Sequence, residues 1–203
     1  MALERLDLLD WRRRVFALYA DVRAAARTDP AAAHARWRAG RDELLRSHPQ
    51  SPIPRAERTR YPGARYAPYD IALRFDLAVD ADVPEARMDV QTATDGIVPF
   101  TRVGVLHLPG LGDLDVWWLA SYGGGVFVPV KDAGAGRTTY GGGRYLIDTV
   151  KGADLGGDVR SGRLVVDLNF AYNPSCAYDP AWACPLAQAG NTLALPLDAG
   201  ELL

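Results

Sequence analysis

In the stretch IALRFDL, residues 71–77, a large apolar side chain occupies every second position. Side chains of a strand alternate between its two faces, so this period of two predicts a half-buried β-strand. Apolar residues before the stretch follow a helical spacing, and several strand-like runs follow it. The stretch therefore marks the change from a helical to a β region, and the chain is predicted to adopt an α+β fold.

Two amphipathic helices are predicted before residue 50. Their apolar stripes, spaced by three and four residues, are Leu8, Trp11, Val15, Leu18 and Val22, then Ala33, Trp37, Leu44 and Leu45. Between them, TDP at 28–30 offers Thr28 or Asp29 as a cap, with Pro30 at the first helical position. Residues 1–50 are therefore predicted to form a helical hairpin that packs on the rest of the protein.

The remainder divides into a Pro-rich linker and a β domain. Residues 51–69 contain Pro52, Pro54, Pro62 and Pro68, which favours an extended linker. Over 70–203, Asp95-Gly96 signals a hairpin, and the strand-like runs include LDVWWLA, VFVPV, RYLID, RLVVDLNF and LALPL. We expect about eight antiparallel strands in a small barrel or sandwich behind the hairpin, in one folding unit.

Composition excludes several classes of protein. The chain has 203 residues, of which 48% are hydrophobic and 24% charged, and this argues against general disorder. A net charge of −2 makes nucleic acid an unexpected partner. The first residues, MALERLDLLDWRRR, form neither a signal peptide nor a membrane span, so we expect a cytoplasmic protein without membrane contact. A homo-oligomer stays open.

The segment NFAYNPSCAYDPAWACPL, residues 169–186, contains both cysteines and an unusual density of aromatic residues and prolines. Asn173 and Asp179 each precede a proline, where turns start readily. The preceding strand places Asp167 and Asn169 on one face. We therefore expect a rigid loop, pinned by its aromatic side chains, that begins beside two polar groups.

The same segment resembles a known family. LNFAYNPSCAYDPAWACPL (168–186), VFVPVKDAGAGRTTYGGGRYL (126–146), DAGE (198–201) and HPQSP (48–52) are similar to the bacterial and archaeal family called domain of unknown function 1684. The resemblance covers most of the chain from the second helix onward and implies homology without an assigned activity. Such proteins often have Arg where Lys131 stands. Lys131 keeps the positive charge, but lysine lacks the geometry with which arginine forms two parallel hydrogen bonds to one anion.

The glycine-rich stretch 131–145 is not a phosphate loop. Its spacing matches neither G-x-x-x-x-G-K-[ST] nor G-x-G-x-x-G, because Gly142 and Thr139 stand at the deciding positions. The glycines are most simply turn residues between strands. The remaining functional interpretation is that backbone N–H groups of this stretch, beside Lys131, Arg137 and Arg144, bind an anion.

Three interpretations of Cys176 and Cys184 compete. Two thiols with seven residues between them do not complete a zinc site, even with His48 or His107, and no histidine lies near them in sequence to act as a base. We favour small buried hydrophobic residues or a local disulfide. His48 is expected to cap the second helix. No metal, cofactor or catalytic residue is assigned.

The candidate site is a pocket at the open end of the β domain, walled by YGGGRY (140–145) and AYNPSCAY (171–178). We expect it to bind or transform a small molecule, anions included. Its candidate residues are Lys131, Asp132, Tyr140, Arg144, Asp167, Asn169, Tyr172, Asn173, Cys176 and Tyr178. Arg144 is predicted to hold either the ligand or a carboxylate, with Asp132 or Asp167 the nearest. The alternative is a structural or partner-binding protein in which the aromatic loop seals the β domain.

Overall fold

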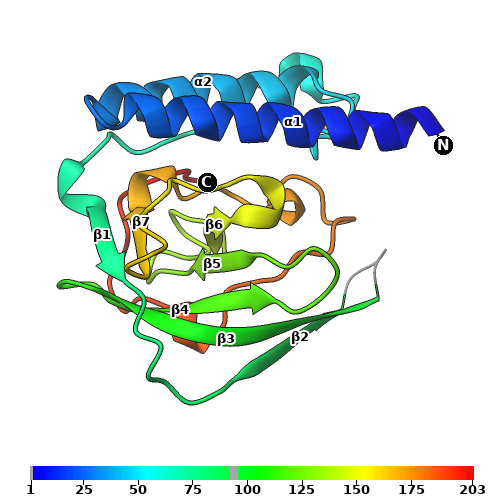
Figure 1. The fold of residues 1–203 in the computed structure, drawn as a ribbon. Helices are drawn as coiled ribbons and strands as arrows, with labels where there is room; N and C mark the ends of the chain where they lie inside the picture. The colour runs from blue at the N-terminus through cyan, green and yellow to red at the C-terminus, as the bar shows by residue number, and fades with distance from the viewer. Residues whose placement is uncertain (1, 92–95) are drawn as a thin grey trace.

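The computed structural model describes residues 2–91 and 96–203. Helices α1 (Ala2–Ala25) and α2 (Pro30–Ser47) form an antiparallel hairpin that lies as a separate layer over the β domain (Figure 1). Asp29 caps α2, because its carboxylate accepts the backbone N–H of Ala32 at 2.9 Å and Pro30 follows it. The predicted helical hairpin is confirmed.

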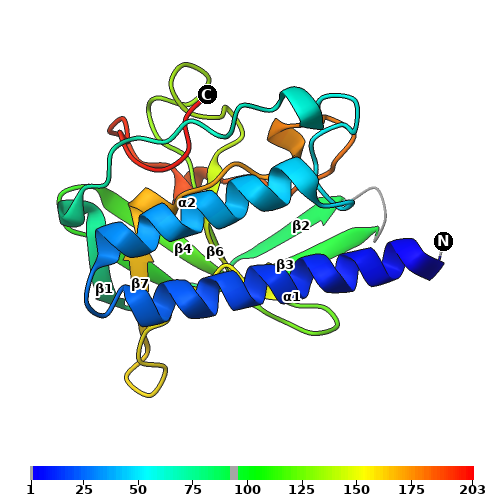
Figure 2. The same cartoon turned by 90° about the horizontal axis from the view of Figure 1, so that it is seen from above.

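The inner face of the hairpin is buried unevenly. Val22, Ala33, Trp37 and Leu45 are buried against the β domain. Leu8, in the same predicted stripe, is 40% exposed. Seen from above, the N-terminal part of α1 extends past the strands (Figure 2), and this explains why the first half of the stripe is covered less.

Seven strands in the described residues form two antiparallel sheets. β1 (Arg74–Ala78) pairs with β7 (Arg163–Asp167) in a two-stranded sheet. The other sheet has the order β2-β3-β4-β5-β6, with the bounds Arg87–Gln91, Ile97–Leu108, Gly112–Leu119, Val126–Val130 and Arg144–Asp148. Six short 3-10 helices complete the described structure: Arg58–Arg60, Ile71–Leu73, Thr149–Lys151 (η3), Leu168–Phe170 (η4), Ser175–Ala177 and Ala189–Asn191.

The predicted α+β class and the antiparallel strands are confirmed. The predicted barrel or sandwich of about eight strands is not confirmed as a barrel, since the described strands number seven and form two separate sheets. After β6 the chain turns through η3, and residues 153–157 lie between β6 and β7. Ala153 bridges to Asp148, and the Gly156 carbonyl accepts the N–H of Val165. A connecting segment thus occupies the place where the sheets would join.

Two of the predicted strands are shorter in the structure than in the prediction, and a third predicted strand does not form. Ile71–Leu73 is a 3-10 turn, because the Asp70 carboxylate accepts the N–H of Ala72. Asp167 ends β7 in the same manner by accepting the N–H of Asn169. LALPL forms no strand, since Pro196 has no N–H for a ladder. Of the expected Asp95-Gly96 turn, Asp95 lies outside the described residues.

The Pro-rich segment 51–69 packs closely at its start. Ser51, Pro52 and Ile53 are buried, and the Arg58 guanidinium donates to the carbonyls of His48, Pro49, Ser51 and Ile53. Further on, the backbone N–H of Ala67 donates to the carbonyl of Gly200, near the C-terminus. The segment therefore ties the end of α2 to the C-terminal chain.

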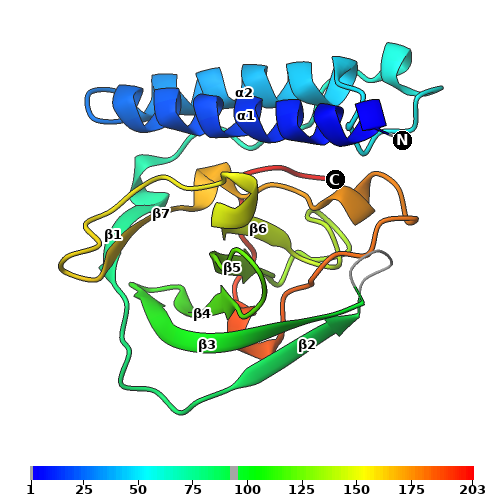
Figure 3. The same cartoon turned by 45° about the vertical axis from the view of Figure 1, so that its right-hand side comes forward.

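Two main groups of apolar residues hold the layers together. One lies between the sheets and the C-terminal chain and includes Leu106, Leu114 and Leu168. The other joins the hairpin to the β domain through Val22, Trp37 and Phe170, and the view in Figure 3 shows the two layers that it connects. No helix in residues 2–91 and 96–203 has the length and hydrophobicity that a membrane crossing requires.

Candidate functional site

Arg144, the predicted anion-binding residue, is fully buried at the start of β6. Its Nη2 lies 3.1 Å from Asp132 Oδ2, and its Nη1 donates to the backbone carbonyls of Ala199 and Glu201. Burial lowers the pKa of Arg144, and Asp132 opposes that shift. The guanidinium therefore holds the C-terminal chain against β6, and its Nε has no hydrogen-bond partner within the described part of the chain.

Asp132 connects the glycine-rich turn to Arg144 and to the C-terminal chain. Its carboxylate accepts the backbone N–H groups of Gly134 and Leu197 and the hydroxyl of Thr139. Lys131 is half-buried, and its backbone pairs with residues 191 and 193. The glycine-rich stretch is thus organised around a buried carboxylate.

Asp167 and Asn169 form a second buried polar group, beside β1. Asp167 accepts from the Tyr69 hydroxyl at 3.1 Å and from Arg74 at 3.2 Å. Asn169 exchanges two hydrogen bonds with the backbone of Asp70. Burial raises the pKa of Asp167. Both side chains join η4 to the beginning of β1.

Tyr140, Cys176 and Cys184 lie together at the loop 171–186. The Tyr140 hydroxyl approaches Cys176 Sγ at 3.5 Å and its carbonyl oxygen at 3.4 Å, and the pKa of Tyr140 rises to about 12 because of Cys176 and burial. Both cysteines are free and half-buried. Burial raises the pKa of the Cys184 thiol. Within the described residues no three His, Cys, Asp or Glu side chains gather as a metal site would require.

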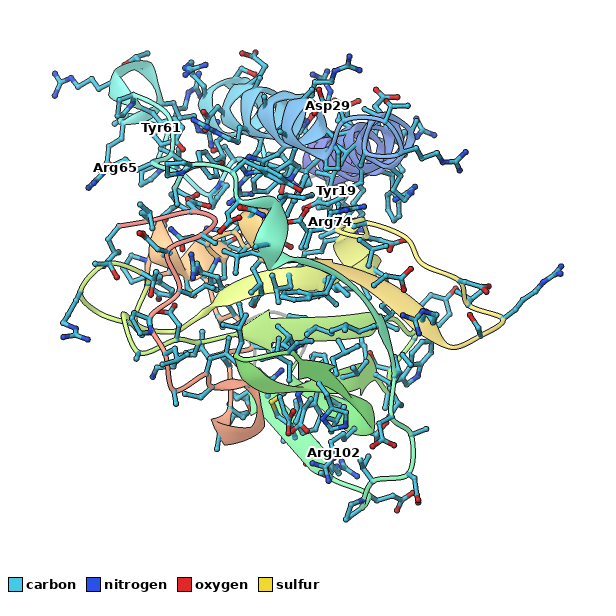
Figure 4. The ribbon with its side chains drawn as sticks, turned by 90° about the vertical axis from the view of Figure 1, so that its left-hand side faces the viewer. Tyr19, Asp29, Tyr61, Arg65, Arg74 and Arg102 are labelled. Carbon is cyan, nitrogen blue, oxygen red and sulfur yellow. The ribbon has the colours of Figure 1, made fainter. Side chains whose placement is uncertain are left out.

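The remaining predicted residues, Tyr172, Asn173 and Tyr178, line a cavity of about 80 Å³ beneath the helical hairpin. We call it the hairpin cavity. Six aromatic residues are among those that line it: Trp11, Tyr19, Trp37, Tyr145, Tyr172 and Tyr178. In Figure 4, Tyr19 lies on the side of the hairpin that faces the β domain. Neither Arg144 nor Asn169 reaches this cavity, so the predicted residues divide among separate places.

Arg41 of α2 is the cationic centre of the hairpin cavity, and the sequence analysis did not identify it. Its Nη2 donates at 3.1 Å to Glu201 Oε2, to the Tyr178 hydroxyl and to the Asn173 carbonyl. Its guanidinium lies 4.6 Å from the centre of the Tyr172 ring. Burial opposes the charge, but Tyr178 and Glu201 raise the pKa of Arg41, which stays protonated.

Glu201 completes this network from the C-terminal chain. It is buried, accepts the backbone N–H of Asn173 at 2.9 Å, and accepts the Tyr178 hydroxyl. A sequence signal for Arg41 was absent, because its partner Glu201 is 160 positions away. Only the docking of α2 on the β domain brings the two together.

A second cation, Lys151, lines the hairpin cavity from η3. Its Nζ lies 3.2 Å from Asp148 Oδ2 and 5.5 Å from the centre of the Tyr145 ring. Asp148 raises the pKa of Lys151. Each cation of the cavity therefore has its own carboxylate.

Three polar atoms of residues that line the hairpin cavity are buried and have no hydrogen-bond partner among residues 2–91 and 96–203: Tyr19 Oη, Arg41 Nε and Asn173 Oδ1. Burial raises the pKa of Tyr19, so its hydroxyl stays protonated and can donate. Residues around the cavity thus carry two donor atoms and one acceptor atom without partners.

Comparison with known proteins identifies the family to which the chain belongs and a solved structure that is similar to it. Residues 59–202 match the family described as Protein of unknown function (DUF1684), and the chain belongs to this family. It is also similar to an uncharacterised protein of Haloarcula marismortui whose solution NMR structure is known. The identity is 31%, the TM-score 0.57, and the similarity covers 82% of this chain and 90% of the other. No curated protein matches.

Proposed function

We propose that the protein binds a small, uncharged polar molecule in the hairpin cavity. The observation that carries the proposal is the set of unpaired atoms, Tyr19 Oη, Arg41 Nε and Asn173 Oδ1, on residues that line one cavity. Leaving a buried polar group without a partner costs about 1–3 kcal/mol. A ligand that supplies the missing partners recovers this energy.

Charge and size narrow the class of ligand. Arg41 is paired with Glu201 and Lys151 with Asp148, so the cavity has no uncompensated charge to attract an anion. Its volume of about 80 Å³ is near half of the roughly 150 Å³ cavity that accepts benzene. A molecule of a few heavy atoms that carries an acceptor beside a donor, such as a primary amide, satisfies both limits.

The sequence included anions among the expected ligands, with Arg144 as the principal residue to bind them. The charge of Arg144 is held by Asp132 and two carbonyls, and this favours the neutral class. The same observation supports the second candidate function, a structural protein without a small ligand, for the region around β6. The two candidates differ in whether the hairpin cavity takes up a molecule.

The test is a heteronuclear NMR titration of the protein with acetamide and, in parallel, with acetate. A four-atom ligand reaches at best about 6 kcal/mol of binding energy, or a Kd of roughly 40 μM, so a technique suited to weak binding is needed. Acetamide is expected to shift resonances of residues around the cavity, while acetate leaves them unchanged.

Two variants make the titration specific. Tyr19→Phe removes one unpaired donor and is expected to weaken acetamide binding about tenfold without lowering the melting temperature. Tyr122→Phe is the matched control, since Tyr122 is fully exposed. Equal binding by both variants, or no saturable shift in the parent protein together with no small molecule retained in native mass spectrometry, would support the structural alternative.

A further inference from the structure

A second cavity, of about 620 Å³, opens between the C-terminal part of α1 and the gap that separates β7 from β5 and β6. We call it the sheet-gap groove. It shares no lining residue with the hairpin cavity. It exists because the two sheets do not close into a barrel. Its volume lies within the range of roughly 300–1,000 Å³ that is typical of ligand sites.

The floor of the sheet-gap groove is apolar. Val126, Ile147 and Leu164 reach it from three strands, and Leu155 follows from the connecting segment. Val126 and Leu164 are only partly buried and pack at the margin of the main core. Apolar surface left at the margin of a core is stabilised when an apolar ligand removes it from water.

The rim of the groove is basic. Three guanidinium groups, of Arg23, Arg27 and Arg74, line it, against one carboxylate, Asp154. Figure 4 shows Arg74 below the hairpin, at the edge of the β domain.

The three arginines differ in how they are engaged. Arg23 donates to the Asp154 carbonyl at 2.7 Å and lies 3.8 Å from its carboxylate, and Arg74 is paired with Asp167. Arg27 is exposed, and within the described parts of the chain it forms neither a hydrogen bond nor an ion pair. It is therefore the guanidinium that is available to an incoming anion.

We propose that the sheet-gap groove binds an amphipathic organic anion, namely a medium-chain carboxylate whose alkyl chain covers Val126 and Leu164 and whose head group pairs with Arg27. The apolar floor and the basic rim complement the two ends of such a molecule. The proposal is independent of the hairpin cavity, because its residues, ligand charge and ligand size are all different.

Isothermal titration calorimetry of the purified protein with hexanoate, octanoate and decanoate tests the proposal, with decanol and inorganic phosphate as comparison ligands. Each added methylene that enters the groove is expected to tighten binding about fourfold. Decanol, which lacks the charge, and phosphate, which lacks the chain, are each expected to bind at least tenfold more weakly than decanoate.

Arg27→Gln is expected to weaken decanoate binding about tenfold. Arg13→Gln, at another exposed arginine of α1, serves as the matched control and leaves the affinity unchanged. Tyr19→Phe also leaves it unchanged, which separates this site from the hairpin cavity. Equal affinity for decanol and decanoate, no dependence on chain length, or equal weakening by Arg13→Gln would overturn the proposal.

Discussion

Arg144 Nη2 and Asp132 Oδ2 form an ion pair of 3.1 Å in which the two side chains are 0% and 1% exposed. The pair links the first residue of β6 to the glycine-rich turn, and through Nη1 of Arg144 it also holds the carbonyl of Glu201. The C-terminal chain that brings Glu201 to Arg41 is thus anchored by a separate buried charge pair.

Replacing Asp132 by Asn is expected to lower the free energy of unfolding by about 3–5 kcal/mol, because the buried guanidinium of Arg144 loses its counter-charge. Urea unfolding measures the change. The matched control is Asp76→Asn, which breaks an exposed ion pair with Arg163 and is expected to cost at most about 1 kcal/mol. Equal losses in the two variants would show that burial does not govern the Arg144 pair.

His34 is expected to make stability depend on pH. It is buried beside Trp37 and Phe170, and burial, with Arg38 nearby, lowers its pKa to about 4. In the unfolded chain a histidine takes up its proton near pH 6.5, so stability is complete above that value and falls as the pH decreases from 6.5 to 4.

The expected loss between pH 7 and pH 5 is about 2 kcal/mol, and His34→Gln should abolish it in urea unfolding at the two values. His107→Gln is the control, because His107 changes the stability with pH in the opposite direction to His34. Asp113 and Asp80 raise the pKa of His107, so its contribution is present at low pH and lost as the pH rises. An unchanged pH dependence in His34→Gln would contradict the assignment.

Gly104 is expected to resist substitution because of close packing. It follows an irregularity in the pairing of β3 with β4, and a Cβ there would lie 2.3 Å from Val79 Cγ1 and 2.7 Å from the Asp80 carbonyl oxygen. Gly104→Ala is expected to cost about 1–3 kcal/mol. Thermal unfolding measures the change in stability. At Gly141 the nearest atom to an added Cβ is 3.7 Å away, so Gly141→Ala is the control and should leave the stability nearly unchanged.

Cys176→Ala is expected to lower the free energy of unfolding by roughly 1–2 kcal/mol without preventing folding, as truncation of a small, partly buried side chain does. The lost contact is with the Tyr140 hydroxyl at 3.5 Å. Elemental analysis provides the second readout. A stoichiometric metal in the parent protein that disappears in the variant would instead make Cys176 a ligand.

The sequence alone determined the helices and strands that depend on interactions between residues close together in the chain. Asp29 and Pro30 start α2 through contacts within one turn, and the stripe around Trp37 sets its buried face. The alternation in 71–77 and the strand-like runs after it predicted where strands form, since strand propensity and the two faces of a strand depend on neighbouring residues, although the run LALPL forms no strand. The loop 168–186 likewise marked the family by its own residues.

Only the tertiary structure decided how these elements close around cavities. Arg144 could have met a ligand or a carboxylate, and the choice of Asp132 depends on how the turn 131–143 folds back on β6. Arg41 and Glu201, 160 positions apart, meet only when the hairpin docks. The failure of the sheets to close depends on where residues 153–157 pack. Such contacts join distant segments, so their energies are set by the whole fold and leave no short-range pattern in the chain.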